Sequence, residues 1–433
     1  MANGCQASPI LKSYIDAGDT VGICVSGGLD SKTVALRLRL AGVKVKCFTA
    51  DIGQPDEEDI NDVVKKMAPC GVETVIVDLK DAIAEGAFET VACMASYDGG
   101  YWQSTGVGRY VTARGLLQEM KKHGCTVLSH GATGRGNDQV RFERYVNVMD
   151  PKFKVYAPWR DPVLLEEFPG RTQMLEFLQK HNIDHKIVSQ AKKRYSTDAN
   201  ILGLSNEAED LESMETPMTI VNPVMGVWPK DAPNKQEEVT LRFVSGRCVE
   251  MNGEQMTPLK VLQTANKIAG RNGIGISQAL ENRILGTKSR GVYEAPGMEL
   301  LAKALQCVYQ AVLDRRSTAL FHHLSRHVAD QIYDGRYFDP STRTAINAIW
   351  DLAVKATGTV KLGLYKGHAH FLALTGCPHS IYFEEDSSME ASAGLNPVSS
   401  QGYLEVSSVE AKALAKAGQI STESVWAKRR KTA

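Results

Sequence analysis

A short stretch near the amino terminus combines the residue types that bind phosphate groups. The apolar run Val21–Val25 is followed by the residues SGGLDSK at positions 26–32, where two glycines precede what reads as a helix. A glycine-rich turn between a strand and a helix points backbone N–H groups at an anion, and the helix dipole adds to the attraction. The stretch therefore predicts a phosphate-binding loop.

Three kinds of loop compete for this stretch. A Walker A loop, G-x-x-x-x-G-K-[ST], requires glycines where Ser26 and Ser31 stand. A nucleophile elbow, G-x-S-x-G, requires a glycine where Cys24 stands. The pattern S-G-G-x-D fits throughout and resembles the loop of the ATP pyrophosphatases, which holds pyrophosphate while ATP is cut between its α and β phosphates. We therefore expect this third kind of loop.

Further motifs follow in an order that resembles one family. The sequence is similar to argininosuccinate synthase, in the longer bacterial form of that family, over nearly its whole length. The blocks that carry the resemblance are SGGLDS at 26–31, TADIGQPDEED at 49–59, HGATGRGNDQVRFE at 130–143, YSTDANILG at 195–203 with EAEDLE at 207–212, IVNPVMGV at 220–227 and ENRILGTKSRGVYEAPG at 281–297.

The resemblance implies an ATP-dependent ligase that joins citrulline to aspartate in arginine biosynthesis. The ureido oxygen of citrulline would attack the α-phosphate of ATP, giving a citrulline-adenylate and pyrophosphate. The aspartate amine would then attack the activated carbon and release AMP. ATP and Mg²⁺ are the expected cofactors. Such a site must align three polar ligands and keep water away from the adenylate.

The resemblance also implies which residues contact the nucleotide. Those around the loop would hold the pyrophosphate, with Mg²⁺ bridging its oxygens, and Ala50 would lie near the adenine. The expected nucleotide contacts are Cys24, Val25, Ser26, Gly27, Gly28, Leu29, Asp30, Ser31, Lys32, Ala50, Gly131, Thr133, Asp138 and Asp198. Those expected to take part in catalysis are Ser26, Asp30, Lys32 and Asp138. No covalent nucleophile is needed, because positioning and electrostatics can carry the rate.

The two amino-acid substrates have their own implied contacts. Thr133, Asn137 and Asp138 match the aspartate-binding positions, and a hydroxyl, an amide and an acid suit an amino acid's charged ends. Arg109 is a candidate clamp for a carboxylate, because a guanidinium binds it bidentately. The expected citrulline contacts are Tyr101, Arg141, Ser196, Ser205, Glu207, Glu281 and Tyr293, and Thr105 is a further expected substrate contact. Taken singly, any of these side chains could instead cap or pack.

Two residues depart from the family pattern. Lys32 places a cation in the first turn of the predicted phosphate-binding helix, where it either neutralises pyrophosphate or points to solvent. Gly106 stands where the family commonly has serine or proline beside citrulline. These changes leave open two alternatives: a related ligase that adenylates another ureido or carbonyl compound, and a nucleotide-binding regulator without catalysis.

Composition limits the partners and the compartment. The 433 residues include 50 basic and 50 acidic side chains, and this balance argues against nucleic acid or an anionic membrane as partner. Nine scattered cysteines without a C-x-x-C pair fit reduced thiols in the cytoplasm. No secretory signal or membrane span is expected. The histidines of FHHLSRH at 321–327 lack an accompanying acid or cysteine, so we expect an ordinary helix there rather than a metal site.

The elements that must position these residues alternate in kind. Strand-like runs at 21–25, 43–49, 73–77 and 126–129 alternate with helical segments, which predicts an α/β fold with a Rossmann-like parallel sheet. We expect Pro55 to lie in a first helical turn. Period-two patterns turn at Ser245-Gly246, Asn252-Gly253 and Lys366-Gly367. The expected domains are 1–188 for nucleotide binding, 189–386 as a mixed α+β synthetase domain, and 387–433 as a linker and C-terminal helix that supports a homotetramer.

Overall fold

The protein is described by a computed structural model that covers residues 15–424 apart from 17, 135, 184–194, 391–393 and 395. Its internal contacts divide the chain into two units, one ending at His379 and the other beginning at Ser380. The first unit contains all three β-sheets. The second contains two helices, α13 (Glu384–Ser387) and α14 (Ser399–Lys416).

The first sheet is parallel and has the strand order β3-β2-β1-β4-β5. In chain order its strands are β1 (Thr20–Cys24), β2 (Lys44–Asp51), β3 (Glu73–Asp78), β4 (Val127–His130) and β5 (Lys154–Tyr156). The chain adds β2 and β3 on one side of β1 and then crosses to add β4 and β5 on the other. In open α/β sheets, ligands bind outside the carboxyl ends of the strands at this reversal. The predicted parallel sheet is confirmed.

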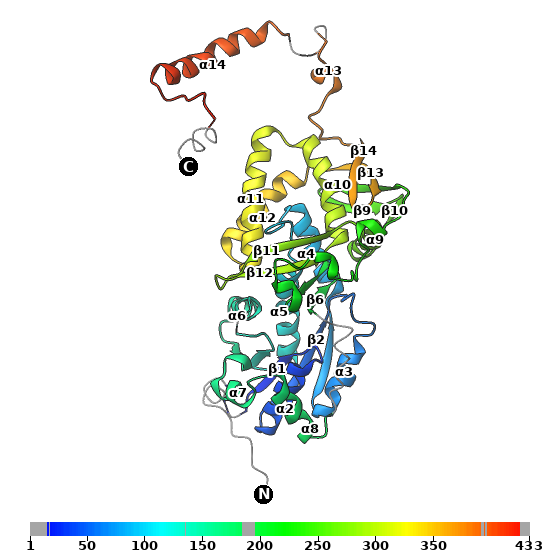
Figure 1. Ribbon diagram of the computed structural model, residues 1–433, viewed down its shortest axis with the longest axis vertical. Coiled ribbons are helices and arrows are strands. Elements are labelled where there is room, and N and C mark those ends of the chain that lie inside the picture. The colour runs from blue at the N-terminus through cyan, green and yellow to red at the C-terminus, as the bar shows by residue number, and fades with distance from the viewer. Residues whose placement is uncertain are drawn as a thin grey trace. The chain divides into compact units, whose positions relative to one another are not determined.

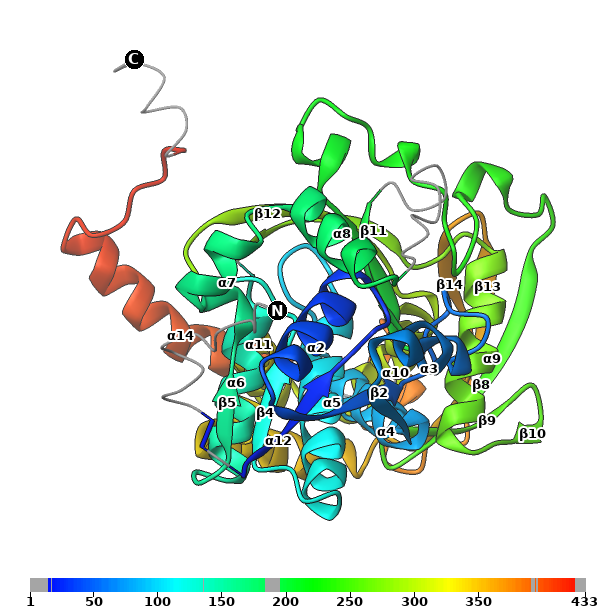
Figure 2. The same ribbon diagram turned by 90° about the horizontal axis from the view of Figure 1, so that it is seen from below.

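Helices cover both faces of the parallel sheet (Figure 2). On β2, Cys47 packs with α2 and α8, whereas the next residue, Phe48, packs with α4 and α5, as alternation along a strand requires. The helices of this region are α2 (Leu29–Leu40), α3 (Asn61–Met67), α4 (Lys80–Ala92), α5 (Ser104–Lys122), α6 (Asp138–Met149), α7 (Pro162–Glu167) and α8 (Arg171–Lys180).

A second sheet is antiparallel, with the order β11-β12-β7-β6. Its strands are β6 (Ser196–Asn200), β7 (Gly203–Glu207), β11 (Ile276–Asn282) and β12 (Lys288–Glu294). In Figure 1, β11 and β12 lie between the parallel sheet and the strands of the third sheet. The second sheet therefore stands next to the parallel sheet.

The third sheet is also antiparallel, with the order β10-β9-β8-β13-β14. Its turns fall at Ser245-Gly246, Asn252-Gly253 and Lys366-Gly367, so the three predicted hairpin turns are confirmed. Its strands are β8 (Glu237–Val244), β9 (Arg247–Met251), β10 (Glu254–Gln255), β13 (Gly358–Tyr365) and β14 (His368–Thr375). The helices around it are α9 (Pro258–Arg271), α10 (Pro296–Val312), α11 (Arg315–Tyr333) and α12 (Pro340–Ala353).

Two local expectations are wrong. Pro55 lies in a turn, and the helix expected there, α3, begins only at Asn61. Asn61 follows an Asp59 carboxylate that accepts hydrogen bonds from both its backbone and its side chain, and this turn starts the helix. The Ser- and Gly-rich sequence SSMEASAGLNPVSSQG at 387–402 predicts a linker of that length, but α14 already begins at Ser399. Among the residues that the structure describes, no helix is long and apolar enough to cross a membrane.

Candidate active site

The loop after β1 has the geometry of an anion site. Gly27 has a φ of +73°, and a Cβ there would lie 3.1 Å from the side chain of Lys66, so only glycine fits this turn. The Ser26 backbone N–H donates to Ser31 Oγ at 3.1 Å, which closes the loop on the helix. Gly28 is the N-cap of α2 and has no side chain to cover the first-turn N–H groups. These groups and the helix dipole are therefore available to a phosphate.

The other nucleotide contacts expected on the parallel sheet lie at the same edge. Ala50 is the penultimate residue of β2, and Gly131 directly follows β4. Cys24 at the end of β1 is in register with His130 at the end of β4, so the loop and Gly131 flank the reversal of strand order. Burial raises the pKa of Cys24 to about 12, which keeps this thiol uncharged beside the loop.

Six predicted site residues share one face of the second sheet. Asp198 pairs with Ser205, which in turn pairs with Tyr293 on the neighbouring strand. Ser196 pairs with Glu207 in the next row. Side chains two residues apart along a strand share a face, so the pairings group Ser196, Asp198, Ser205, Glu207, Glu281 and Tyr293. The sheet thus gathers residues that are almost 100 positions apart in the chain.

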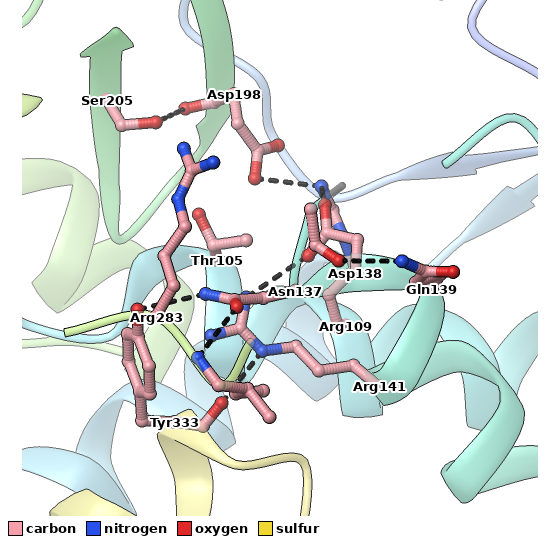
Figure 3. Close-up of polar contacts among 12 residues, drawn as sticks. Thr105, Arg109, Asn137, Asp138, Gln139, Arg141, Asp198, Ser205, Arg283 and Tyr333 are labelled. Carbon is pink, nitrogen blue, oxygen red and sulfur yellow. Dashed lines mark hydrogen bonds and ion pairs between the residues drawn. The ribbon is translucent and has the colours of Figure 1, made fainter. Parts of the chain in front are cut away.

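Arg109 connects this sheet to the start of α6 (Figure 3). Its Nη2 atom donates to Asp138 Oδ2 at 2.7 Å and to Asp198 Oδ2 at 2.9 Å. Arg141 Nη1 donates to the other oxygen of Asp138 at 3.1 Å. Burial raises the pKa of Asp138, but Arg109 and Arg141 outweigh burial and lower this pKa to about 2. Asp138 is therefore ionised at neutral pH, and Arg109 bonds protein carboxylates here.

Arg141 and Tyr101, two predicted citrulline contacts, are both buried. Arg141 is 2% exposed, and its Nη2 atom has no hydrogen-bond partner within the described part of the chain. A buried, unpaired donor of this kind can bind a substrate acceptor. The Tyr101 hydroxyl accepts a bond from the Thr105 backbone N–H at 2.8 Å, and its ring lies 4.4 Å from that of Tyr293.

Two carboxylates, Glu207 and Glu281, lie on the same face of the sheet. Burial and the negative charge of Glu281 raise the pKa of Glu207 to about 7, against the lowering effect of Arg283. Arg283 Nη2 donates to Glu207 Oε2 at 3.0 Å, and the Tyr293 hydroxyl lies 3.1 Å from Glu281 Oε1. This arrangement offers acceptors to a ligand that carries several N–H donors.

The two unusual residues lie in buried positions. Lys32 is 6% exposed, so the alternative that it points to solvent is wrong, and its charge opposes the rise in the pKa of Cys70 that burial causes. Gly106 packs against α11: a Cβ there would lie 3.0 Å from both Gln103 Oε1 and Ile332 Cγ2. The space that a side chain at Gly106 would need is thus already filled by protein.

Two residues around the site were not predicted from the sequence. Arg283 lies inside the 281–297 block, beside predicted Glu281, so its cationic charge was a usable signal. Tyr333 ends α11, and its hydroxyl accepts a hydrogen bond from Asn137 Nδ2 at 2.9 Å. The sequence around Tyr333 shows only the end of an amphipathic helix, so no pattern indicated this contact.

Thr133 is exposed in the loop after β4. Thr133, Asn137 and Asp138 lie within the turn that leads from that strand into α6, and Asn137 is the N-cap of that helix. The turn thus carries the three predicted aspartate contacts between the phosphate loop and the sheet face.

Comparison with protein-family models agrees with this organisation. Residues 20–184 match a family described as "Arginosuccinate synthase N-terminal HUP domain". Residues 195–414 match a second, described as "Arginosuccinate synthase C-terminal domain". The first match contains the parallel sheet and its phosphate loop, and the second contains both antiparallel sheets. The chain belongs to the argininosuccinate synthase family.

Proposed function

We propose that the site described above carries out the reaction of this family through named groups. The enzyme is an ATP-dependent ligase that joins citrulline to aspartate and converts ATP into AMP and pyrophosphate. The observation that carries the assignment of the site is its layout: a phosphate loop at one sheet edge, an acidic sheet face beside it, and Arg109 bonded to acids on both sides.

The first step is adenylation of citrulline. The N–H groups around Gly27 and Gly28 bind the β and γ phosphates, where the amino end of α2 stabilises the charge that develops on departing pyrophosphate. The ureido oxygen forms a bond to the α-phosphorus as the bond to pyrophosphate breaks. Lys32, in the first turn of α2, adds positive charge near this end of the helix.

The acidic sheet face holds citrulline in this proposal. Glu207 and Glu281 accept hydrogen bonds from its N–H groups, and the free Nη2 of Arg141 binds its carboxylate. Ser196, Ser205 and Tyr293 provide hydroxyls on the same face. Such fixed contacts place the ureido oxygen against the α-phosphorus, which is the main source of rate in a reaction without a covalent enzyme intermediate.

Aspartate binds at the turn before α6. Asp138 is held ionised by two arginines, so it can accept hydrogen bonds from the substrate's amino group. Thr133 and Asn137 provide a hydroxyl and an amide for the substrate's carboxylates. The amine then attacks the adenylated carbon, and the bond from that carbon to oxygen breaks as AMP departs.

Mg²⁺ is proposed to enter with ATP. Within the described ranges, no group of three or more His, Cys, Asp or Glu side chains could hold a metal ion. Mg²⁺ often binds through substrate phosphates and water with only one or two protein carboxylates, so this donor set is compatible with a phosphate-bound ion. The ion would neutralise phosphate oxygens beside the loop.

The remaining expectations concern the whole chain. We propose a nucleotide-binding domain at 1–188, a synthetase domain at 189–386 and an oligomerisation segment at 387–433, in a cytoplasmic homotetramer. Support for association comes from α14, which buries none of its residues and exposes Tyr403, Leu404 and Val409. Support for a reducing compartment comes from Cys47, Cys70, Cys93, Cys125 and Cys248, which are buried and form no disulfide.

Product analysis tests the proposal. The purified protein should form AMP and pyrophosphate in equal amounts when ATP, Mg²⁺, citrulline and aspartate are all present, together with argininosuccinate. Omission of aspartate should leave only the first step, seen as exchange of labelled pyrophosphate into ATP. Formation of ADP and orthophosphate with the same substrates would contradict the assignment of the loop.

A further inference from the structure

Tyr333 lies where the two proposed amino-acid sites meet. It is the last residue of α11 and is only 1% exposed, although a helix end is usually a solvated place for a hydroxyl. Its ring stacks on Tyr97, with centroids 3.9 Å apart and planes 12° apart. Its backbone oxygen accepts a bond from Arg141 Nε at 2.9 Å. The ring thus packs on Tyr97 and the backbone oxygen bonds Arg141, and the hydroxyl makes contacts that are separate from these two.

The hydroxyl fixes one face of the proposed aspartate site. Asn137 Nδ2 donates to the Tyr333 hydroxyl at 2.9 Å, while Asn137 Oδ1 accepts from the Ile284 backbone N–H at 3.0 Å (Figure 3). The amide is therefore held at both ends, and its orientation follows from these two partners. The second N–H of the amide remains for a substrate carboxylate.

Tyr333 also borders the proposed citrulline site, because it packs in one cluster with Tyr101 and Tyr293. Its hydroxyl accepts a hydrogen bond from Asn137 Nδ2, so the proton of the hydroxyl is available to another acceptor. Burial and the Glu281 carboxylate both raise the pKa of Tyr333 above its usual value. Glu281 is also in contact with the Tyr293 hydroxyl. Tyr333 thus bonds Asn137, assigned to aspartate, and packs with Tyr293, assigned to citrulline.

We propose that Tyr333 is a positioning residue whose hydroxyl orients the Asn137 amide, so that aspartate is held in one placement relative to the citrulline-adenylate. This inference rests on the proposed function. Tyr333 itself would touch neither substrate. Its effect on the reaction would pass through the Asn137 amide that it holds.

The fold places Tyr333 by close packing with α5. Ile332, the preceding residue, lies against Gly106, and any larger residue at Gly106 would push on this contact. The end of α11 can therefore approach the site closely enough for a hydroxyl to reach Asn137. The absence of a side chain at Gly106 thus lets the end of α11, which carries Tyr333, lie close to α5.

The substitution Tyr333→Phe removes the hydroxyl and keeps the ring and the backbone contact with Arg141. We expect the KM for aspartate to rise at least fivefold and the KM for citrulline to rise less, while the KM for ATP stays within twofold. Tyr97→Phe is the matched control, because it removes a hydroxyl from the same stacked pair, one that donates to the Asn282 backbone oxygen. It should leave all three KM values within twofold.

A double-mutant cycle separates positioning from packing. In an Asn137→Ala background, adding Tyr333→Phe should change the KM for aspartate less than twofold, because the hydroxyl acts through the missing amide. The same cycle measured by urea unfolding should show coupling between the two residues and does not depend on catalysis. An unchanged aspartate KM in Tyr333→Phe, or a full effect in the Asn137→Ala background, would overturn the inference. If wild-type protein forms no argininosuccinate, the proposed function itself fails.

Discussion

Arg109 on α5 donates to Asp198 on β6 at 2.9 Å, and the same nitrogen donates to Asp138 at 2.7 Å. One guanidinium group thus neutralises two carboxylates that come from the two family-matched halves of the chain. Without it, two partly buried negative charges would face each other. Arg109 therefore places one cation between the two carboxylates.

Replacement of Arg109 should destabilise the protein. We expect Arg109→Met to lower the free energy of unfolding by about 2 kcal/mol or more at neutral pH, because removal of one partner leaves the other charges unpaired. Arg114→Met, on the same helix, is the control for loss of a cationic side chain. Urea unfolding of both variants gives the comparison. An equal, small loss in both would contradict a special role for the Arg109 contacts.

At acidic pH, the difference in free energy of unfolding between Arg109→Met and the wild type should become smaller. The pKa of Asp138 is lowered to about 2 in the folded protein, below its usual 3.8, so its contribution to stability is present above about pH 4 and is lost as the pH falls toward 2. The deficit of Arg109→Met should therefore shrink as the pH is lowered through this range. Urea unfolding at a series of pH values measures it, and a deficit independent of pH would contradict the charge argument.

Glu207 should make the protein less stable as the pH rises toward neutrality. Its pKa is raised from 4.5 to about 7, so the folded state favours its protonated form. Its contribution is full below about pH 4.5 and is lost as the pH rises through 7. Relative to wild type, Glu207→Gln should gain melting temperature across this interval. The melting temperature of the control Glu212→Gln, at an exposed position, should change with pH as that of the wild type does. If the melting temperature of Glu207→Gln also changes in this way, Glu207 does not have the raised pKa.

The same ionisation should appear in substrate binding. If ionised Glu207 accepts hydrogen bonds from citrulline, the KM for citrulline should fall as the pH rises through about 7. The Glu207→Gln enzyme should show a higher KM that no longer changes across this range. Initial rates at saturating ATP and aspartate provide the measurement. A wild-type KM that stays flat from about pH 6 to about pH 8 would remove Glu207 from the binding site.

Lys32 is a buried cation in the first turn of α2, and its removal should weaken ATP binding. We expect Lys32→Ser to raise the KM for ATP about tenfold, the equivalent of about 1.4 kcal/mol, and to weaken product inhibition by pyrophosphate. Arg39→Ser, an exposed change near the end of the same helix, is the control. Normal ATP binding in Lys32→Ser would show that the ammonium serves the packing of the helix alone.

The parts predicted best from the sequence depend on local chemistry. The strand, glycine turn and helix at residues 20–40, the parallel strands and the hairpin turns each follow from a few adjacent residues, and the structure confirms these elements. The start of α3 was wrong because the Asp59–Asn61 turn sets it, several residues after the proline. Proline tolerates a first helical turn but does not require one.

The parts that the sequence could not show depend on contacts between distant segments. Tyr333 meets Asn137 across 196 positions of sequence, and no spacing pattern encodes that meeting. The burial of Lys32 likewise depends on segments packed around α2, so charge alone favoured neither of its two interpretations. Motifs predicted a set of candidate side chains, whereas the packing of α5 and α11 decides how they are held.

The two-residue turn that joins β6 to β7 has an evolutionary consequence. Asp198 and Ser196 share a face with Ser205 and Glu207 only because the pairing of the two strands is fixed. Insertion or deletion of a single residue within either strand would rotate the rest of that strand by half a repeat and turn its functional groups away from the ligands. Among descendants of this enzyme, insertions and deletions should therefore be absent from this hairpin and should occur in the outer loops of the protein.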